Sequence, residues 1–552
     1  MMSRLCRIAS GLAAAFVLGA CVNNALPATS SSTTMNAPAG EVAGIVEGDV
    51  RAFKGIPFAK PPVGEARWKA PAPLPRWDGV RDASEFGPAC VQPTARGVSV
   101  YSQDIGATSE DCLTLNIWSP KAATNAPVLV WIHGGALSTG SSKERLYDGA
   151  ALARRGVVVV SINYRLGVLG YLAYAGLSAE SADGVSGNYG LLDQIEALKW
   201  VQRNIGAFGG DTSNVTIAGE SAGALSVMYL MASPNARGLF AKAIAQSAYM
   251  ISTPELKQAR HGAMAAEATG AMLASKLGAT DVSGLRAVDA QTITDTAAAS
   301  GFGPLGVVDG KILPAQLVDI FDRGEQARVP LLVGFNSGEI RTLTVLAPPA
   351  VANADEYERV IRERYGDLTN EFLRLYPASE QQESIYANTR DALYGWTSER
   401  LARKQTELGA PSFLYLFDHA YPATSEANLH AFHASELPFM FGTLTRTPPY
   451  WPKIETSEAQ QSFSDAMIGY WTSFATTGRP TAIGAPDWPA YGADRAFMHF
   501  ADTPQVSRNL YPGMYELHEA AVCRRKASGA APWNWNTGLA SPKLGERTPS
   551  CP

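Results

Sequence analysis

The chain has 552 residues, of which 46% are hydrophobic and 18% are charged, so it can bury a large core and is not disordered by composition. Its formal net charge is -5, and its Lys and Arg residues form no phosphate-binding stripe. We therefore expect a globular protein that does not bind nucleic acid.

The first twenty residues have the pattern of an export signal. Arg4 and Arg7 precede an apolar run, residues 8–20, that is too short to span a bilayer. The run ends in Leu-Gly-Ala-Cys, which resembles the lipobox of bacterial lipoproteins, so we expect cleavage after Ala20 and lipidation of Cys21. The product would be a periplasmic or cell-surface lipoprotein with possible membrane attachment through Cys21. The alternative is ordinary secretion with cleavage a few residues later.

Residues 21–41 are expected to be a flexible tether. Residues 25–40 are rich in Ser, Thr, Ala and Pro and lack the periodicity of a core-forming element. The expected organisation is a signal peptide at residues 1–20, this tether, and a single folded domain with insertions at residues 42–552.

The cysteines are consistent with an oxidising destination. Four remain once the signal peptide and Cys21 are set aside: Cys90, Cys112, Cys523 and Cys551. We expect a disulfide between Cys90 and Cys112, and the pairing of the other two stays open. No CxxC or His/Cys cluster indicates a metal, and no motif indicates a cofactor.

Strand-like apolar runs alternate with helical stretches along the chain. Several runs are β-branched and apolar without alternation, which is typical of parallel strands covered on both faces by helices. This pattern predicts an α/β fold with a central, mostly parallel sheet. The predicted strands are residues 128–133, 157–164, 214–219, 241–246, 330–335 and 413–417.

Three segments are predicted to be helical. Residues 191–204 carry apolar side chains at helical spacing with charged residues between them, which indicates a helix that covers the sheet. Residues 255–299 and 354–400 lie between predicted core strands. We expect these two segments to form large helical insertions around the active site.

The strongest chemical signal is a GxSxG motif, Gly219 to Gly223, with Ser221 at its centre. It follows a predicted strand and precedes a helical stretch at residues 225–231, which is the context of a nucleophilic serine. A strained turn flanked by small residues exposes the hydroxyl to a base. The alternative, a helix-capping serine, is disfavoured because the motif directly follows a strand.

A second motif lies where the strand at residues 128–132 runs into His-Gly-Gly-Ala. The backbone N–H groups of Gly135 and Ala136, joined by that of Ala222, would surround the oxyanion that forms when Ser221 attacks a carbonyl. The alternative is a glycine-rich turn at the end of a strand.

Several longer stretches of the sequence resemble the type-B carboxylesterase family, which includes cholinesterases, bacterial nitrobenzyl esterases and fungal lipases. Their length makes this resemblance more specific than the GxSxG motif alone. The resemblance covers residues 42–491 and implies an α/β-hydrolase fold that hydrolyses small-molecule carboxylic esters. The matching stretches are FKGIPFAKPPVGEARWKAP (53–71), SEDCLTLNIWSP (109–120), NYRLGVLG (163–170), residues 187–221, and WTSFATTGRP (471–480).

The resemblance also implies the catalytic acid. The family places it after a strand in a glycine turn, usually as Asp-Glu-Gly, and here residues 331–339 read LLVGFNSGE. Glu339 is therefore the expected acid, with Asp309 as a weaker competitor. Its neighbours differ from the family pattern, because Gly338 replaces an acidic residue and Ile340 replaces a glycine.

Seven histidines compete for the role of base. His433 opens HASELPFMFG, which matches the family's catalytic-histidine stretch, whereas His430 lacks this continuation. His433 would accept the proton of Ser221, with Glu339 holding the imidazole, and its pKa is expected at about 6 to 7. The resemblance further implies that Glu220 and Glu436 lie behind the site as hydrogen-bond acceptors.

Two departures from the family pattern bear on function. Relatives usually have three glycines where this chain has Gly134, Gly135 and Ala136, and the backbone donor survives if its dihedrals suit an L-residue. Residues 90–112 contain Tyr101 but no Trp, which cholinesterases use there to bind a quaternary ammonium group. We therefore expect an exported general carboxylesterase. The alternative is a catalytically inactive, cholinesterase-like adhesion or binding protein.

Overall fold

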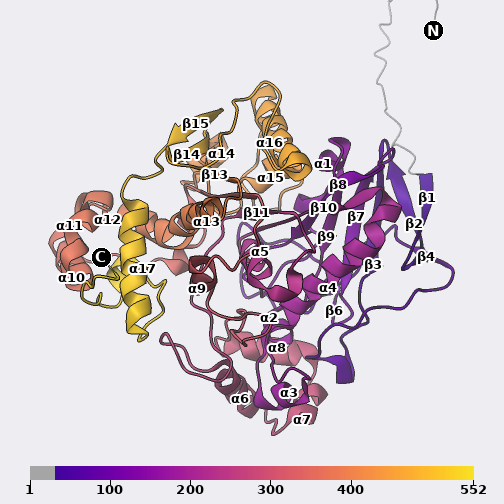
Figure 1. Cartoon of the computed structure of the whole chain (residues 1–552), viewed down its shortest axis with the longest axis horizontal. Helices are drawn as coiled ribbons and strands as arrows, with labels where there is room; N and C mark the ends of the chain where they lie inside the picture. Colours follow the sequence, from indigo (N-terminus) through magenta and orange to yellow (C-terminus); the bar gives the residue numbers. More distant parts are fainter. Residues whose placement is uncertain (1–30, 552) are drawn as a thin grey trace, which may run out of the picture.

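The computed structural model describes residues 31–551. Its centre is a 13-stranded sheet in the order β1-β2-β3-β7-β9-β8-β10-β11-β12-β13-β14-β15, with β4 beside β2, and β5 and β6 form a separate pair (Figure 1). The strands are β1 (Ser31–Ala37), β2 (Gly40–Glu47), β3 (Val50–Pro57), β4 (Val80–Asp82), β5 (Ala89–Cys90), β6 (Thr108–Ser109), β7 (Thr114–Pro120), β8 (Ala126–Ile132), β9 (Val158–Ile162), β10 (Gly210–Glu220), β11 (Lys242–Gln246), β12 (Leu331–Asn336), β13 (Ser412–Phe417), β14 (Ala496–Phe500) and β15 (Pro504–Arg508).

The interior of the sheet is parallel. Every neighbouring pair from β9 through β8, β10, β11, β12 and β13 to β14 runs in the same direction. Outside this block, β1 with β2, β2 with β3, β3 with β7, β7 with β9, and β14 with β15 are antiparallel, whereas the short β4 runs parallel to β2. All six predicted strands are present, and the expected α/β-hydrolase architecture is confirmed.

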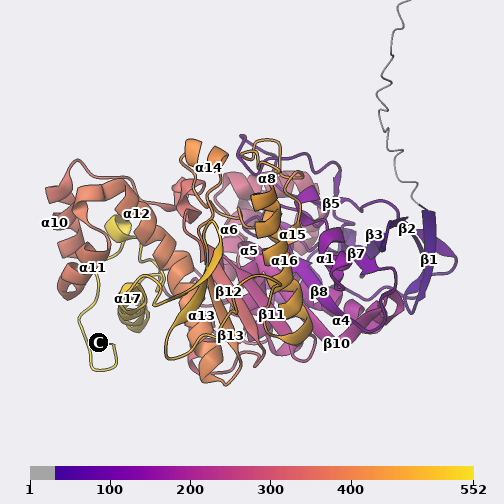
Figure 2. The same cartoon turned by 90° about the horizontal axis from the view of Figure 1, so that it is seen from above.

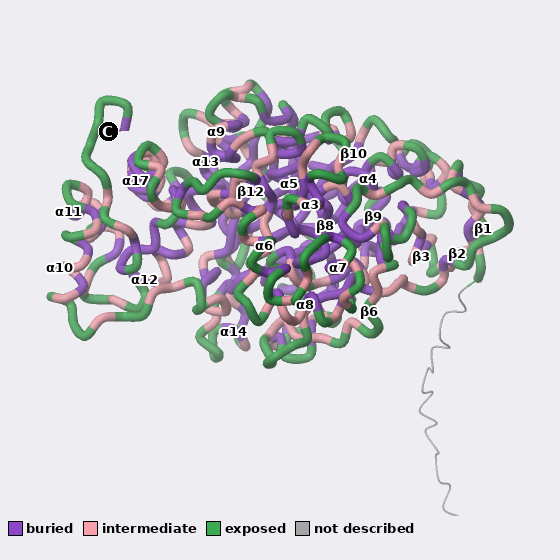
Figure 3. The backbone as a smooth tube through the Cα atoms, turned by 90° about the horizontal axis from the view of Figure 1, so that it is seen from below, coloured by how far each residue is buried: buried purple, intermediate pink, exposed green. Residues whose placement is uncertain are grey.

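Helices cover the sheet, and the central strands are buried (Figure 3). The helices are α1 (Ala150–Arg154), α2 (Gly167–Tyr171), α3 (Ala175–Glu180), α4 (Tyr189–Asn204), α5 (Ala222–Ala232), α6 (Ala266–Lys276), α7 (Val282–Ala287), α8 (Ala290–Ala299), α9 (Leu317–Asp322), α10 (Ala354–Tyr365), α11 (Thr369–Leu375), α12 (Gln381–Arg390), α13 (Trp396–Glu407), α14 (Pro422–Glu426), α15 (Leu437–Phe441), α16 (Glu458–Thr477) and α17 (Met514–Ser528).

The three predicted helical segments are confirmed. Helix α4 accounts for residues 191–204 and turns Leu191, Ile195 and Leu198 into the core. Helices α6 to α8 occupy the first expected insertion, and α10 to α13 occupy the second. Helices α10 to α12 gather beside α17 at one end of the molecule (Figures 1 and 2).

The expected tether is wrong for residues 31–41. Strand β1 pairs antiparallel with β2 from Ser31 opposite Val46 to Ala37 opposite Gly40. Threonine favours extended backbone, so the composition that suggested a tether also suits a polar edge strand. The folded domain therefore includes residues 31–41, while the predicted signal peptide and Cys21 lie outside the described residues.

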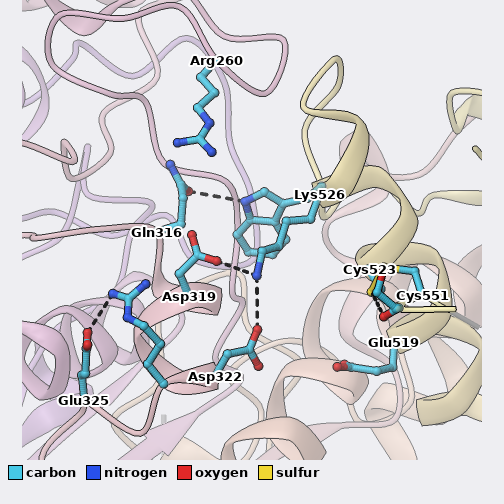
Figure 4. A network of polar contacts seen from close by, with 12 residues as sticks. Arg260, Gln316, Asp319, Asp322, Glu325, Glu519, Cys523, Lys526 and Cys551 are labelled. Carbon is cyan, nitrogen blue, oxygen red and sulfur yellow. Dashed lines mark hydrogen bonds and ion pairs between the residues drawn. A yellow bond between two sulfur atoms is a disulfide. The ribbon is translucent and has the colours of Figure 1, made fainter. Parts of the chain in front are cut away.

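The segment after α17 folds back onto the body of the protein. Trp533 is fully buried, and its Nε1 donates a hydrogen bond to Gln316 Oε1 at 3.4 Å. On α17, the Lys526 ammonium group lies 2.5 Å from Asp319 and 3.3 Å from Asp322, both on α9 (Figure 4). These contacts fasten the last helix to an element more than two hundred residues earlier.

Two disulfides are formed within residues 31–551. Cys90 is joined to Cys112, as expected. Cys523 on α17 is joined to Cys551, the pairing that the sequence left open, and the bond closes a loop with a sequence separation of 28 residues (Figure 4). Among residues 31–551, no helix is both long and apolar enough to cross a bilayer.

Removal of the second disulfide is expected to lower the free energy of unfolding. In a Cys523→Ser/Cys551→Ser variant the unfolded chain gains loop entropy, which costs about 3 kcal/mol of stability. Urea unfolding, followed by fluorescence, measures this difference. An unfolding midpoint equal to that of the wild type would contradict a stabilising role for the C-terminal bridge.

Candidate active site

The parallel sheet brings the three predicted catalytic side chains to one edge. Ser221 directly follows β10, Glu339 lies three residues after β12, and His433 lies between α14 and α15, in the segment that follows β13. Strands β10, β11, β12 and β13 are neighbours and run in the same direction, so their carboxyl ends meet at this edge.

Ser221 occupies a strained turn between β10 and α5. Its backbone has φ 56° and ψ -120°, a region that costs an L-residue about 1–3 kcal/mol. Its N–H donates to the carbonyl of Gln246 at 2.9 Å, and its own carbonyl accepts from Leu225 N at 2.9 Å. The residue remains partly exposed, so its hydroxyl is available to a ligand.

The two glycines of the motif are required by close backbone contacts. A Cβ atom on Gly219 would lie 2.5 Å from the carbonyl carbon of Gly223. A Cβ atom on Gly223 would lie 2.0 Å from the carbonyl oxygen of Ile132, at the end of β8. Any larger residue at either position would push α5 away from the sheet and open the turn at Ser221.

The Gly-Gly-Ala loop lies beside this turn. A Cβ atom on Gly134 would be only 3.3 Å from the Cβ of Ser221. Within residues 31–551, the N–H groups of Gly135 and Ala136 donate no hydrogen bond to the protein, and Ala222 opens α5, where N–H groups lack intrahelical partners. Three backbone donors are thus available next to Ser221.

Ala136 does not have the dihedrals that suit an L-residue. Its φ is 55°, and Leu137 follows with φ 56°. The left-handed conformation costs about 1–2 kcal/mol per residue. The exposed methyl group of Ala136 is therefore held in a conformation that glycine adopts freely, while its N–H stays unpaired.

His433 and Glu339 are directly paired. His433 Nδ1 is hydrogen-bonded to Glu339 Oε2, and Glu339 Oε1 accepts from Asn336 N at 2.9 Å. Both side chains are buried. The carboxylate is thus fixed by its own strand end and turned toward the imidazole.

The unusual glycine before Glu339 has a local cause. A Cβ atom on Gly338 would lie 2.8 Å from the carbonyl oxygen of Leu429 and 2.9 Å from that of Ala431. Gly338 N also donates to Ala431 O at 2.8 Å. The backbone that carries His433 therefore presses against this turn, which leaves no room for the acidic side chain of the family pattern.

Glu220 lies on the other side of the imidazole. His433 Nε2 is 3.0 Å from Glu220 Oε1, and the structure has no hydrogen bond between His433 and the Ser221 hydroxyl. Apo sites often leave the bond between nucleophile and base open until substrate binds. The structure brings Ser221, Glu339 and His433 together, but the hydrogen bond between His433 Nε2 and the Ser221 hydroxyl is not formed.

Glu436 lies behind the site in a hydrogen-bond network. Its Oε2 accepts from Asn336 Nδ2 at 2.6 Å and its Oε1 from Gln246 Nε2 at 2.9 Å. Trp471 Nε1 in turn donates to Gln246 Oε1 at 2.9 Å. This buried carboxylate is therefore fully paired and holds the ends of β11 and β12 together.

Burial and neighbouring carboxylates shift the titration of the site. Burial lowers the pKa of His433, but the charges of Glu220 and Glu339 outweigh burial and raise the pKa above its ordinary value and above the range expected from the sequence. Burial raises the pKa of Glu220 and of Glu436. Because His433 and Glu220 are in contact, they titrate as a pair.

The competing residues lie elsewhere. Asp309 accepts hydrogen bonds from Asn188 Nδ2 at 2.8 Å and from the backbone N–H of Lys311, which stabilises the turn at residues 309–311. His430 is exposed and contacts Asn428 at 3.2 Å. Neither residue makes a hydrogen bond to Ser221 or Glu339 in the described part of the chain.

Several residues that the sequence did not single out also contact the site. Gln246 and Asn336 are the last residues of the apolar strands β11 and β12. A polar residue at the end of an apolar strand is the only feature of the sequence that could have indicated their role. Tyr394 comes from a π-helical turn, Asp391–Gly395, and its ring centroid lies 5.5 Å from that of His433. Such turns are rare and recur at functional sites.

This architecture is that of an α/β-hydrolase, with a serine, a histidine and a glutamate at the carboxyl edge of the sheet. A model of the carboxylesterase family matches residues 31–517, so the chain belongs to this family.

Known esterases resemble the chain over most of its length. Fumonisin B1 esterase of Sphingopyxis macrogoltabida is 38% identical, with 90% of this chain and 91% of the relative covered. Para-nitrobenzyl esterase of Bacillus subtilis (strain 168) is 37% identical, with 82% and 91% covered. A solved PNB esterase structure superposes with a TM-score of 0.77 at 33% identity, covering 88% of this chain and 99% of that one.

The protein is therefore a carboxylic ester hydrolase that acts on small-molecule esters. The alternative of an inactive adhesion or binding protein is not favoured, because these relatives are named for esterase activity.

A Glu220→Gln variant is expected to shift the pH dependence of kcat/KM to lower pH. The predicted base, His433, must be neutral to accept a proton, so kcat/KM is expected to rise with pH through the pKa of this histidine. The negative charge of Glu220 beside Nε2 raises this pKa. Its removal lowers the pKa, so kcat/KM should increase at a lower pH than in the wild type. The measurement is kcat/KM for p-nitrophenyl butyrate across pH.

The matched control is Glu407→Gln, at an exposed carboxylate paired with Lys404, which should leave the profile unchanged. A rise at unchanged or higher pH in Glu220→Gln would show that Glu220 does not govern the titration of His433.

Proposed function

We propose that the protein hydrolyses carboxylic esters through a covalent acyl-enzyme on Ser221, with His433 as general base and acid and Glu339 as its orienting carboxylate. The observation that carries the proposal is the buried His433–Glu339 hydrogen bond at the edge where Ser221 is held in its strained turn. This arrangement matches the roles of a serine hydrolase triad.

In the first half-reaction, Ser221 Oγ attacks the ester carbonyl while His433 Nε2 takes the hydroxyl proton. The tetrahedral intermediate then expels the alcohol, which leaves with that proton, and an acyl ester remains on Ser221. His433 Nε2 must therefore exchange its contact with Glu220, 3.0 Å away, for one with the Ser221 hydroxyl. Water completes the second half-reaction in the same way and releases the acid.

The negative charge of each intermediate would be held by the N–H groups of Gly135, Ala136 and Ala222. These donors are fixed by the Ser221 turn and by the left-handed backbone at Gly135 and Ala136. A preorganised donor of this kind contributes about 10²- to 10³-fold in kcat. Ala136 adopts the left-handed backbone that glycine would have in relatives, and its N–H group is therefore still available as a donor.

The relatives supply the first substrates to test. A p-nitrobenzyl ester and fumonisin B1 follow from the names of two relatives, and p-nitrophenyl esters of increasing acyl length probe the acyl pocket. The absence of Trp from residues 90–112 argues for a general carboxylesterase over a cholinesterase.

Substitution of the proposed triad is expected to abolish turnover. Ser221→Ala removes the nucleophile and His433→Ala the base, so each should lower kcat/KM by a factor of about 10³ or more. His430→Ala, at an exposed histidine three residues away, is the matched control and should keep most of the activity. The assay is p-nitrophenyl ester hydrolysis with folding checked by circular dichroism.

Equal activity in Ser221→Ala and the wild type would refute the acyl-enzyme. Loss of activity in His430→Ala with retention in His433→Ala would show that the base is the other histidine.

We also infer that the protein is exported as a lipoprotein through Cys21. The supporting observations are the signal-like run before Cys21 and two disulfides, Cys90–Cys112 and Cys523–Cys551, which persist in oxidising compartments.

Expression in a bacterium with a lipoprotein pathway tests this inference. The wild type is expected in the detergent phase after Triton X-114 partition, because an attached lipid confers membrane affinity. A Cys21→Ser variant is expected in the aqueous phase. Wild-type protein in the aqueous phase would refute lipidation.

A further inference from the structure

The loop between Cys90 and Cys112 contacts the histidine of the site directly. Tyr101, near the middle of this loop, donates a hydrogen bond from its hydroxyl to the backbone carbonyl of His433 at 2.9 Å. The same hydroxyl lies 2.6 Å from Thr342 Oγ1. A phenol has one hydrogen, so Thr342 must be the donor in the second contact. Tyr101 thus joins His433 to Thr342, three residues after Glu339.

Aromatic neighbours hold the Tyr101 ring in place. Its centroid lies 5.9 Å from that of Trp451 and 6.5 Å from that of His433, both edge to face, and 6.4 Å from that of Phe432. Edge-to-face packing at these separations is favourable. The hydroxyl is therefore aimed at the His433 carbonyl by a fixed ring.

The backbone that this hydrogen bond restrains is strained. Ala434, the residue after His433, has φ 69°, in the region that disfavours an L-residue. In the described part of the chain, the His433 carbonyl has no other hydrogen bond, whereas that of Phe432 accepts from both Asn336 Nδ2 and Ser435 N. The His433–Ala434 peptide depends on Tyr101 for its orientation.

The loop is anchored on both sides of the site. The Cys90–Cys112 disulfide closes its base. On the side of the Gly-Gly-Ala loop, Gln103 Nε2 donates to Glu144 Oε2 at 2.6 Å, and Glu144 Oε1 accepts from Ser141 N at 3.1 Å. The loop therefore forms a strap, residues 90–112, with Tyr101 on His433 and Gln103 fixed beside it.

We propose that Tyr101 is a positioning residue for His433: the disulfide-closed strap holds the phenol hydroxyl on the His433 carbonyl and so keeps the imidazole paired with Glu339. This inference rests on the proposed function, because it assigns Tyr101 a part in the same reaction. The Tyr101 hydroxyl acts through the backbone of His433 and, in the described part of the chain, makes no hydrogen bond to Ser221, Glu339 or the imidazole nitrogens.

The titratable groups around the imidazole determine how the pKa of His433 would change if the side chain were displaced. They are Glu220, Glu339, Glu436, Tyr101 and Tyr394. The charge of Glu220 and then the contact with Glu339, through its charge and its hydrogen bond, raise the pKa of His433 against the effect of burial. An imidazole that is held less well loses part of this contact, so its pKa falls.

The test is a Tyr101→Phe variant, which keeps the ring and removes the hydroxyl. We expect kcat for p-nitrophenyl butyrate to fall about tenfold with KM changed less than about twofold, because small misplacements of a catalytic group are costly. The rise of kcat/KM with pH should also move to lower pH. A change in packing alone would not move this profile.

The matched control is Tyr470→Phe. Tyr470 makes the same type of bond, from its hydroxyl to the Pro486 carbonyl at 2.6 Å, on α16. This variant should keep the wild-type kcat and pH profile. Wild-type behaviour in Tyr101→Phe would overturn the inference and leave the chemistry of Ser221 standing. Absence of Ser221-dependent turnover in the wild type would overturn both.

A second pair of variants tests the strap. Cys90→Ala/Cys112→Ala should lower kcat and shift the pH profile in the same direction as Tyr101→Phe. Cys523→Ser/Cys551→Ser removes a disulfide far along the chain and should change stability without moving the profile. Equal profiles for the two cysteine variants would overturn the role of the strap.

Discussion

The close backbone contact between the start of α5 and the end of β8 is the constraint on which the site depends. Gly223 lies so near the carbonyl of Ile132 that a methyl group cannot fit between them. This contact, with the hydrogen bond from Ser221 N to Gln246 O, holds Ser221 in a conformation that an L-residue avoids. The parallel pairing of β10 with β8 and β11 places these contacts on either side of the turn.

The same edge of the sheet concentrates negative charge around one histidine. Glu220, Glu339 and Glu436 are all buried near His433. Glu339 and Glu436 accept hydrogen bonds that stabilise them, whereas Glu220 has only the imidazole as its charge partner. Asn336 serves two of them, giving its backbone N–H to Glu339 and its side chain to Glu436. The end of β12 thus provides donors for two of the carboxylates that surround the proposed base.

Sequence reasoning was most successful where local pattern and tertiary structure coincide. The six apolar runs became six strands because parallel strands are apolar on both faces, and GxSxG followed a strand as expected. It failed at residues 31–41, where pairing with β2 overrides a tether-like composition. The contact of Tyr101 with His433 and the Cys523–Cys551 bond join residues that no local pattern connects, so only the fold could reveal them.

Covalent trapping of the nucleophile tests whether Ser221 is activated for attack on an ester. The protein is treated with a fluorophosphonate ester, which phosphonylates a serine activated by a neighbouring base, and the modified peptide is identified by mass spectrometry. The account predicts a single adduct on Ser221 that is formed far more slowly in His433→Ala. No adduct on folded protein, or one on another residue, would contradict an acyl-enzyme at Ser221.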